Sequence, residues 1–377
     1  MTYTLSDVDG PLTLLSLLYD PIYEIQEDKE AETGAQLNET LNSISETTFK
    51  DCKHAMRSVH AKSHGLLIAE LQVHPNLPTV LAQGIFSHPK NYLAVMRLST
   101  TPGDMLDYSV STPRGLALKV IGVEGERVEG SIGDETQDFL LVNGPMFLTP
   151  SSKKFLSSLK LLAKMTDKVP TLKKALSAVL RGTEKVVEAL GGESAVIISM
   201  GGHPEKHILG ETFFSQAPIL YGPYMAKISV TPVSSELLAL VKSPLNVNGK
   251  LNGLRDALVD FFATKEAEWE LRVQLCTDLE TMPIKDSTIP WPEEISPYIS
   301  IAKITAKPQA AWSERLSKKI DDGMSFSPWN AVAAHRPIGS IMRLRKAAYE
   351  TSANFRALHN EVKVSEPTDL DELYAQS

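Results

Sequence analysis

The sequence predicts an α+β protein whose main body is an antiparallel β-barrel or sandwich accompanied by helices. Several short stretches carry large residues at alternate positions, which is typical of half-buried strands. The turns between them contain Pro102-Gly103, Pro113 and Gly125, so short strands follow one another and disfavour repeated βαβ units. Because no internal repeat or low-complexity linker divides the chain, we expect one continuous domain behind an N-terminal arm.

Composition excludes several classes of protein. The 377 residues are 42% hydrophobic and 22% charged, as in ordinary globular proteins, and the net charge of −8 gives no general attraction to nucleic acid or anionic membrane. Cys52 and Cys276 lie far apart without metal-ligand spacing, which predicts neither a disulfide scaffold nor a zinc site and fits a cytoplasmic location. The apolar run from Pro11 to Tyr19 is too short to span a membrane and has no signal-peptide charge pattern.

The strand candidates fall into two groups on either side of a helical insertion. We expect an arm and helix over residues 1–50, with apolar residues at helical spacing up to Met56, and a domain over residues 51–377. The insertion covers about residues 151–192, and further helices are expected at 251–263 and from Ser340 to about His359. The predicted strands are residues 66–73, 91–99, 115–121, 138–143, 194–199, 224–230 and 268–275.

The helical insertion is strongly basic in an acidic protein. Its lysines and one arginine far outnumber its acidic residues. Such a helical pair suits a membrane surface or the guidance of anionic lipid substrates. A solvated helical hairpin that packs on the main body explains the same pattern, and we favour this second interpretation.

His60 stands at the start of a predicted strand, between Val59 and Ala61 and three residues after Arg57. A histidine in apolar surroundings is suited to proton transfer, because small changes in its environment move its pKa through the working range. Taken alone, a structural histidine is the better interpretation. We take the nearby His54, His64 and His74 as ordinary surface or packing residues.

One stripe of the C-terminal helix carries Arg345, Tyr349, Ser352 and Arg356, at spacings of four, three and four residues. An arginine one turn before a tyrosine favours the phenolate over the phenol. A tyrosinate is a hard anionic donor suited to ferric haem iron. Taken alone, a surface contact between Arg345 and Tyr349 is again the better interpretation.

Read together, the two ends of the chain resemble the haem-dependent catalase family, and most closely its small bacterial catalase-like branch. Six short motifs of that family occur here in the family's order between residues 57 and 356. Each is weak by itself, but their shared order makes the match specific. They are Arg57-Ser58-Val59-His60-Ala61, Arg97-Leu98-Ser99, Pro113-Arg114-Gly115, Val142-Asn143-Gly144-Pro145, Phe326-Ser327-Pro328-Trp329-Asn330, and Arg345 with Tyr349 and Arg356.

The resemblance implies a fold and a set of residue roles. The fold is an eight-stranded antiparallel barrel with surrounding helices, and the cofactor is haem b, whose iron takes Tyr349 as ligand. His60 is then the distal acid and base, Asn143 orients peroxide, and Ser99 fixes the tautomer of His60. The remaining cofactor contacts implied by the resemblance are Arg345 beside the ligand, Arg57, Arg97 and Arg356 at the propionates, and Val59 and Phe147 in the pocket wall.

Three functions stay open. We favour decomposition of hydrogen peroxide by dismutation or peroxidation, a role in the response to oxidative stress. Conversion of organic or fatty-acid hydroperoxides is the alternative, because only 28 residues follow Tyr349 and a less buried pocket admits a larger substrate. Non-enzymatic haem binding is the third. No helical domain follows the ligand helix, so NADPH binding is not expected, while the electron donor and a homo-oligomeric state are left open.

Overall fold

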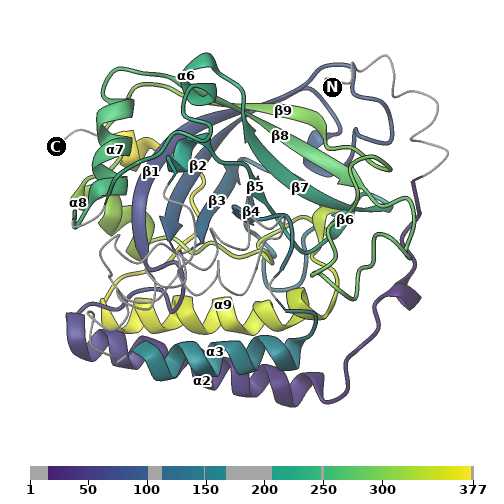
Figure 1. Ribbon diagram of the computed structural model, residues 1–377, viewed down its shortest axis with the longest axis horizontal. Coiled ribbons are helices and arrows are strands. Elements are labelled where there is room, and N and C mark those ends of the chain that lie inside the picture. Colours follow the sequence, from purple (N-terminus) through teal and green to yellow (C-terminus); the bar gives the residue numbers. More distant parts are fainter. Residues whose placement is uncertain (1–15, 101–112, 148, 167–205, 248–249, 375–377) are drawn as a thin grey trace.

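The computed structural model describes residues 16–100, 113–147, 149–166, 206–247 and 250–374 (Figure 1). Its main body is a single antiparallel sheet with the strand order β5-β4-β3-β2-β1-β9-β8-β7-β6. The strands are β1 (Lys62–Val73), β2 (Asn91–Thr100), β3 (Arg114–Ile121), β4 (Thr136–Val142), β5 (Phe213–Phe214), β6 (Ile219–Tyr221), β7 (Tyr224–Pro232), β8 (Ala267–Leu275) and β9 (Ile299–Ala306).

The sheet closes on itself because β5 pairs with β7 as well as with β4. Eight strands form the closed ring, and β6 extends β7 outside it through a hairpin. The predicted eight-stranded antiparallel barrel is confirmed. The closure depends on a strand of only two residues, and β4 contacts it through the single pair Val142 and Phe214.

Alternation of side chains along each strand fills the barrel. On β1, Leu67, Ala69, Leu71 and Val73 are buried in the main core, while Leu66 packs in a separate cluster outside the barrel. β-Branched and aromatic residues on β7 and β8 complete the interior. The strand pattern read from the sequence therefore reports the inner and outer faces of the barrel.

Three long helices form a layer beneath the barrel (Figure 1). They are α2 (Glu30–Cys52), α3 (Ser152–Thr166) and α9 (Ser340–His359), and they share one apolar cluster. Because α3 contacts α2 and α9, the described part of the basic insertion packs within the helical layer. The shorter elements are α6 (Ser235–Leu238), α7 (Gly253–Phe262), α8 (Glu314–Leu316), α10 (Asp371–Tyr374), η2 (Pro21–Tyr23), η3 (Gly84–Phe86), η4 (Ile208–Gly210), η6 (Ala333–His335) and a π-helical turn, η5 (Ser317–Asp322).

Most of the predicted elements are present, with boundary differences of a few residues. The first helix ends at Cys52 and not at Met56, because Lys53 adopts a left-handed conformation that terminates it. Strands β5, β6 and β9 were not predicted. The predicted second block of the insertion and the strand at 194–199 lie outside the described residues.

Carboxylates of the N-terminal arm bind the start of α9. Arg343 donates to Glu24 and Glu30, each at 2.7 Å, and Ser340 donates to Glu27 at 2.7 Å. These contacts tie the arm to the helix that carries Tyr349. A domain boundary near residue 50 stays a prediction.

A charged network is buried between the barrel and the C-terminal tail. The ammonium of Lys119 on β3 donates to Asp138 on β4 at 2.7 Å and also to Glu366, which the tail brings in. Glu366 accepts further bonds from Thr136 and Asn330, at 2.7 and 2.8 Å. The tail is thereby fastened to two strands by one carboxylate.

His335 provides a prediction on pH dependence. Its side chain is buried among Phe86, Phe139 and Tyr221, and burial lowers its pKa from 6.5 to about 4. Between pH 6.5 and 4 the unfolded chain therefore binds a proton at His335 that the folded protein does not bind. The contribution of neutral His335 to the free energy of unfolding is fully present above pH 6.5 and is lost as pH falls toward 4. His335→Gln is expected to reduce this acid loss by about 2–3 kcal/mol, whereas the same change at exposed His88 leaves it unchanged.

The measurement is the urea unfolding free energy at pH 7.0 and pH 4.5 for both variants. An equal pH dependence in His335→Gln and in the unaltered protein would contradict the assignment.

Candidate functional site

His60 lies in the turn that leads into β1, at the edge of the barrel. Its backbone is left-handed, with φ of 54°, which a non-glycine residue adopts at a cost. Its Nδ1 lies 3.3 Å from Ser99 Oγ on β2, within hydrogen-bond distance. The turn and the strand together fix the direction of the imidazole ring and present its other nitrogen, Nε2, away from Ser99.

The electrostatic surroundings keep this imidazole neutral. Burial, followed by the positive charges of Arg97, Arg345 and Arg57 in that order, lowers the pKa of His60 from 6.5 to about 3. A neutral ring has one nitrogen that can accept a proton. At neutral pH His60 is therefore available as a proton acceptor.

Gly115 on β3 makes room for the ring. Ser99 pairs with Gly115 in the sheet, and a Cβ atom at position 115 would lie 2.6 Å from His60 Nδ1 and Cε1. Gly115→Ala is therefore expected to push the ring away from Ser99.

We expect the Gly115→Ala change to lower any turnover that uses His60 at least tenfold. The free energy of unfolding is expected to change by roughly 1–3 kcal/mol. Gly122→Ala is the comparison, because a Cβ at position 122 would meet no atom within 4 Å, while the positive φ of this residue adds some backbone strain. Turnover and the free energy of unfolding are measured for both variants. An equal loss of turnover in the two variants would disprove the role of Gly115 in making room for the His60 ring.

Asn143 follows the residue of β4 that pairs with Gly115, which places it near the His60 turn. Its Oδ1 accepts from the backbone N–H of Arg114 at 2.9 Å, and its Nδ2 donates to Glu211 at 3.0 Å. Glu211 also forms an ion pair with Arg114 at 3.0 Å. The amide oxygen thus meets a donor and the amide nitrogen meets an acceptor, which fixes the orientation of the amide.

Arg345 and Tyr349 meet one turn apart on α9. The guanidinium donates to the tyrosine hydroxyl at 2.8 Å, and its carbon lies 5.2 Å from the centre of the ring. The same arginine lowers the pKa of His60, so α9 brings its charge close to the His60 turn. Residues from opposite ends of the chain, His60 and Arg345, are therefore close enough for the charge of one to act on the other.

Three arginines converge beside the His60 turn. Arg97 donates to the carbonyl of His60 at 2.9 Å and, through Nε, to the Asp321 carboxylate at 2.7 Å. Arg57 donates to the Asp321 carbonyl at 2.7 Å and to the Met324 carbonyl at 3.0 Å. Arg356 donates to that Met324 carbonyl at 3.4 Å. We call these three arginines the guanidinium cluster.

The guanidinium cluster has the donors for an anionic ligand. Arg356 Nε is buried and finds no acceptor among the described residues. Burial and repulsion from Arg97 lower the pKa of Arg356 to about 10, and burial with repulsion from Arg356 and Arg97 lowers that of Arg57. Buried guanidinium groups are stabilised by carboxylates. The donors of the guanidinium cluster, together with Tyr349, fit haem.

Val59 and Phe147 are placed at the helical layer. Val59 packs against the cluster shared by α2, α3 and α9. The ring of Phe147 contacts that of Phe155 on α3, with centres 5.1 Å apart. Both residues therefore contact the helical layer, and their role in a pocket wall stays a prediction.

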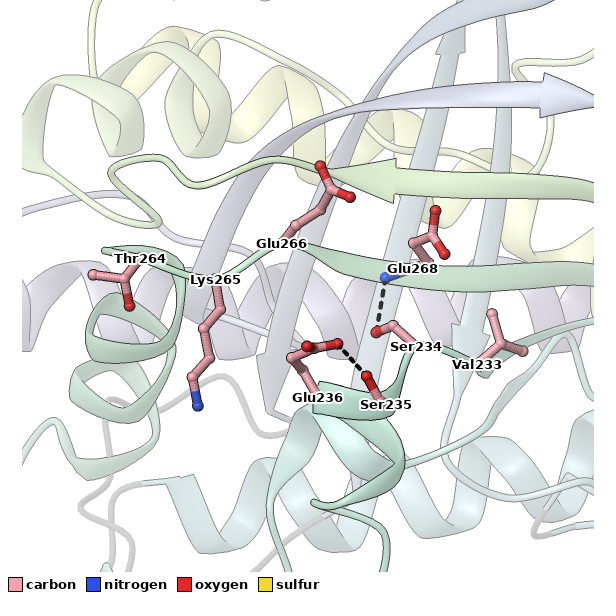
Figure 2. Close-up of a pocket in the computed structure, with 8 residues that line it drawn as sticks. All are labelled: Val233, Ser234, Ser235, Glu236, Thr264, Lys265, Glu266 and Glu268. Atoms are coloured by element: carbon pink, nitrogen blue, oxygen red, sulfur yellow. Dashed lines mark hydrogen bonds between the residues drawn. The ribbon is translucent and has the colours of Figure 1, made fainter.

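A surface pocket on another part of the molecule holds none of these residues (Figure 2). Its lining includes Glu236, Glu266 and Glu268. Glu268 pairs with Thr305, which pairs with Glu70 on β1, eight residues beyond the start of that strand. At about 3.3 Å per residue the pocket lies roughly 25 Å from the His60 end of the barrel.

The described part of the chain has neither a membrane-spanning helix nor a cluster of usual metal ligands. No helix there is long and apolar enough to cross a membrane. No group of three or more histidine, cysteine or acidic side chains there is arranged to hold a metal ion. A tyrosine ligand to haem iron would not produce such a group.

Sequence reasoning missed Glu211 and Asp321. Both contact predicted residues, but each lies on a segment whose sequence carries no motif. Asp321 is the last residue but one of η5, and Glu211 follows η4. Only their position in space indicates a role.

Comparisons with known proteins bear on the fold. No family model and no curated protein matches the sequence. Among solved structures, a fungal catalase, a bacterial catalase and catalase A from Saccharomyces cerevisiae match with TM-scores of 0.58, 0.59 and 0.55 and identities of 16%, 16% and 15%. Each match covers 87% of this chain and, in the same order, 70%, 63% and 72% of the other chain. The chain has a catalase-like fold.

Proposed function

We propose that this protein is a haem-dependent enzyme that decomposes peroxide, a catalase or peroxidase. The observation that carries the proposal is the juxtaposition of two pairs, His60 with Ser99 and Arg345 with Tyr349. The charge of Arg345 contributes to the low pKa of His60, which supports the assignment of both pairs to one site. Haem binding alone does not require the distal pair, which disfavours a purely haem-binding role.

The residues of this site would hold haem b between the barrel and α9. Tyr349 would bind the iron through its hydroxyl oxygen, and Arg345 would keep that oxygen anionic. Arg57, Arg97 and Arg356 would bind the propionates, and Val59 and Phe147 would contribute to the apolar wall. When bound, haem supplies a redox-active iron at which the O–O bond of a peroxide is cleaved.

The distal residues move and guide the proton. Ser99 holds Nδ1 of His60, so Nε2 faces the substrate and takes a proton from one peroxide oxygen. The same nitrogen returns it to the other oxygen, which leaves as water. Asn143 orients the peroxide, and its own orientation is set by Arg114 and Glu211.

The experiment is stopped-flow absorbance of the protein loaded with haemin, mixed separately with hydrogen peroxide and with a polyunsaturated fatty-acid hydroperoxide. Rapid oxygen release from hydrogen peroxide supports the proposal. Rapid consumption of the lipid hydroperoxide with little oxygen would move the assignment to a hydroperoxide-converting enzyme. A tyrosinate-type haem spectrum that Tyr349→Phe abolishes, without any turnover, would leave a haem-binding protein.

We also propose a cytoplasmic location for the enzyme. Cys52 is exposed and Cys276 is buried, and the two cysteines form no disulfide with each other. Cysteines stay reduced in a reducing compartment. This proposal is tested by fractionation of cells that express the full chain.

A further inference from the structure

The carboxylate of Asp321 lies at the centre of the guanidinium cluster. Its Oδ1 accepts from Arg97 Nε at 2.7 Å and lies 3.5 Å from Arg57. Its Oδ2 accepts from the hydroxyls of Ser63 and Ser317, at 2.7 and 2.8 Å. Burial opposes ionisation of this group, but Arg97 and Arg57 together with these hydrogen bonds hold its pKa below the usual value.

The π-helical turn η5 delivers this residue to the cluster. A Cβ at Gly323, which follows the turn, would lie 2.6 Å from the Lys319 carbonyl oxygen, so the chain can leave the turn this way only with glycine. Single π-turns are frequent at functional sites. Here the turn presents both the carboxylate and the carbonyl oxygen of Asp321 to arginines.

The charges of the cluster do not balance. Arg57, Arg97 and Arg356 carry three positive charges, and Asp321 is the one carboxylate bonded to them among the described residues. The neighbouring residue Asp322 instead accepts from His54 at 3.0 Å. The charge of Asp322 nevertheless acts to raise the pKa of Arg57 and of Arg356. The cluster therefore keeps a positive excess beside the buried Nε of Arg356 that has no acceptor.

We propose that Asp321 is a positioning residue that stabilises the three arginines in haem-free protein and, by its charge, weakens their hold on the carboxylates of the bound cofactor. This inference rests on the proposed function, because it takes haem as the ligand. The carboxylate of Asp321 then has two opposite effects. It favours folding of the haem-free protein and opposes binding of haem. A simple structural ion pair would have no such opposition.

The decisive variant is Asp321→Asn, which keeps the shape and the acceptor for Arg97 but removes the charge. Haemin affinity, measured by titration of the Soret band, is expected to rise about tenfold, while the haem-free protein melts at a lower temperature. Haemin dimethyl ester carries no propionate charge, so its affinity is expected to stay unchanged. Glu314→Gln removes an exposed carboxylate from the preceding helix α8 and is expected to change none of these values.

Unchanged or weaker binding of haemin to Asp321→Asn, or an equal gain with the dimethyl ester, would overturn the inference. If Asp321→Asn does not fold, Asp321→Ser also removes the charge, and it is expected to tighten haemin binding in the same titration. No gain in that variant would likewise overturn it.

A separate measurement distinguishes failure of the proposed function from failure of this inference. If unaltered protein binds no haemin, the proposed function fails. The role of Asp321 is then decided by thermal melting of haem-free protein in inorganic phosphate, against chloride at equal ionic strength. A larger phosphate stabilisation of Asp321→Asn than of the unaltered protein supports the charge-balancing role, and an equal stabilisation contradicts it.

Discussion

Replacing His60 with alanine is expected to lower peroxide turnover by about 10²–10⁴-fold without loss of haem binding. In the proposed mechanism the imidazole moves a proton between the two peroxide oxygens, and its low pKa keeps it in the neutral form that can accept one. Methyl cannot replace this function. Haem binding is kept because the predicted ligand, Tyr349, and its partner Arg345 lie on a different element.

The measurement is the initial rate of oxygen release together with the Soret absorbance of each haem-loaded variant. His74→Ala is the matched control, since His74 lies just beyond the far end of β1 and bonds Ser300 at 2.8 Å. It is expected to keep the full rate. Equal rates in His60→Ala and in the unaltered protein would remove His60 from the chemistry.

Replacing Lys119 with methionine is expected to destabilise the protein by about 3–5 kcal/mol. Methionine matches the length of lysine but leaves Asp138 and Glu366 buried without their shared cation. Even with Lys119 present, burial raises the pKa of Asp138 to about 7. In the variant, both carboxylates favour the protonated form, so its stability is expected to recover as pH falls from 8 toward 5.

Urea unfolding of Lys119→Met and of Lys90→Met provides the check. Lys90 lies 3.3 Å from Glu124 on the surface, where an ion pair contributes at most about 1 kcal/mol. A similar small loss in both variants would show that the buried network does not stabilise the fold. A loss that grows on acidification would contradict the assigned direction of the Asp138 pKa.

Local patterns were enough to predict the barrel but not its closure. Alternating side chains identify β1, β2, β3 and β4, because each strand has one face in the core. The two residues of β5 are too few to show any period, although the ring closes through them. Closure is set by contacts between distant segments, which periodicity does not record.

The candidate site divides in the same way. His60, Ser99, Tyr349 and the guanidinium cluster stand in short motifs whose order along the chain identified them. Val59 and Phe147 were expected in the pocket wall, and that role stays a prediction. Asp321 was not found, because its importance arises from arginines that approach it from β2 and from the segment before β1. A carboxylate in a lysine-rich helical turn has no local signature.

Synthesis of the chain imposes an order on the buried network. Lys119 leaves the ribosome 247 residues before Glu366, the carboxylate that the C-terminal tail contributes. At about 5–20 residues per second this delay is roughly 12–50 s. During that time Asp138 is the one carboxylate among the described residues that Lys119 can bind, so β3 and β4 carry an incomplete charge network while the rest of the barrel is made. A nascent chain arrested before residue 366 should therefore resist protease less at these strands than the released protein does.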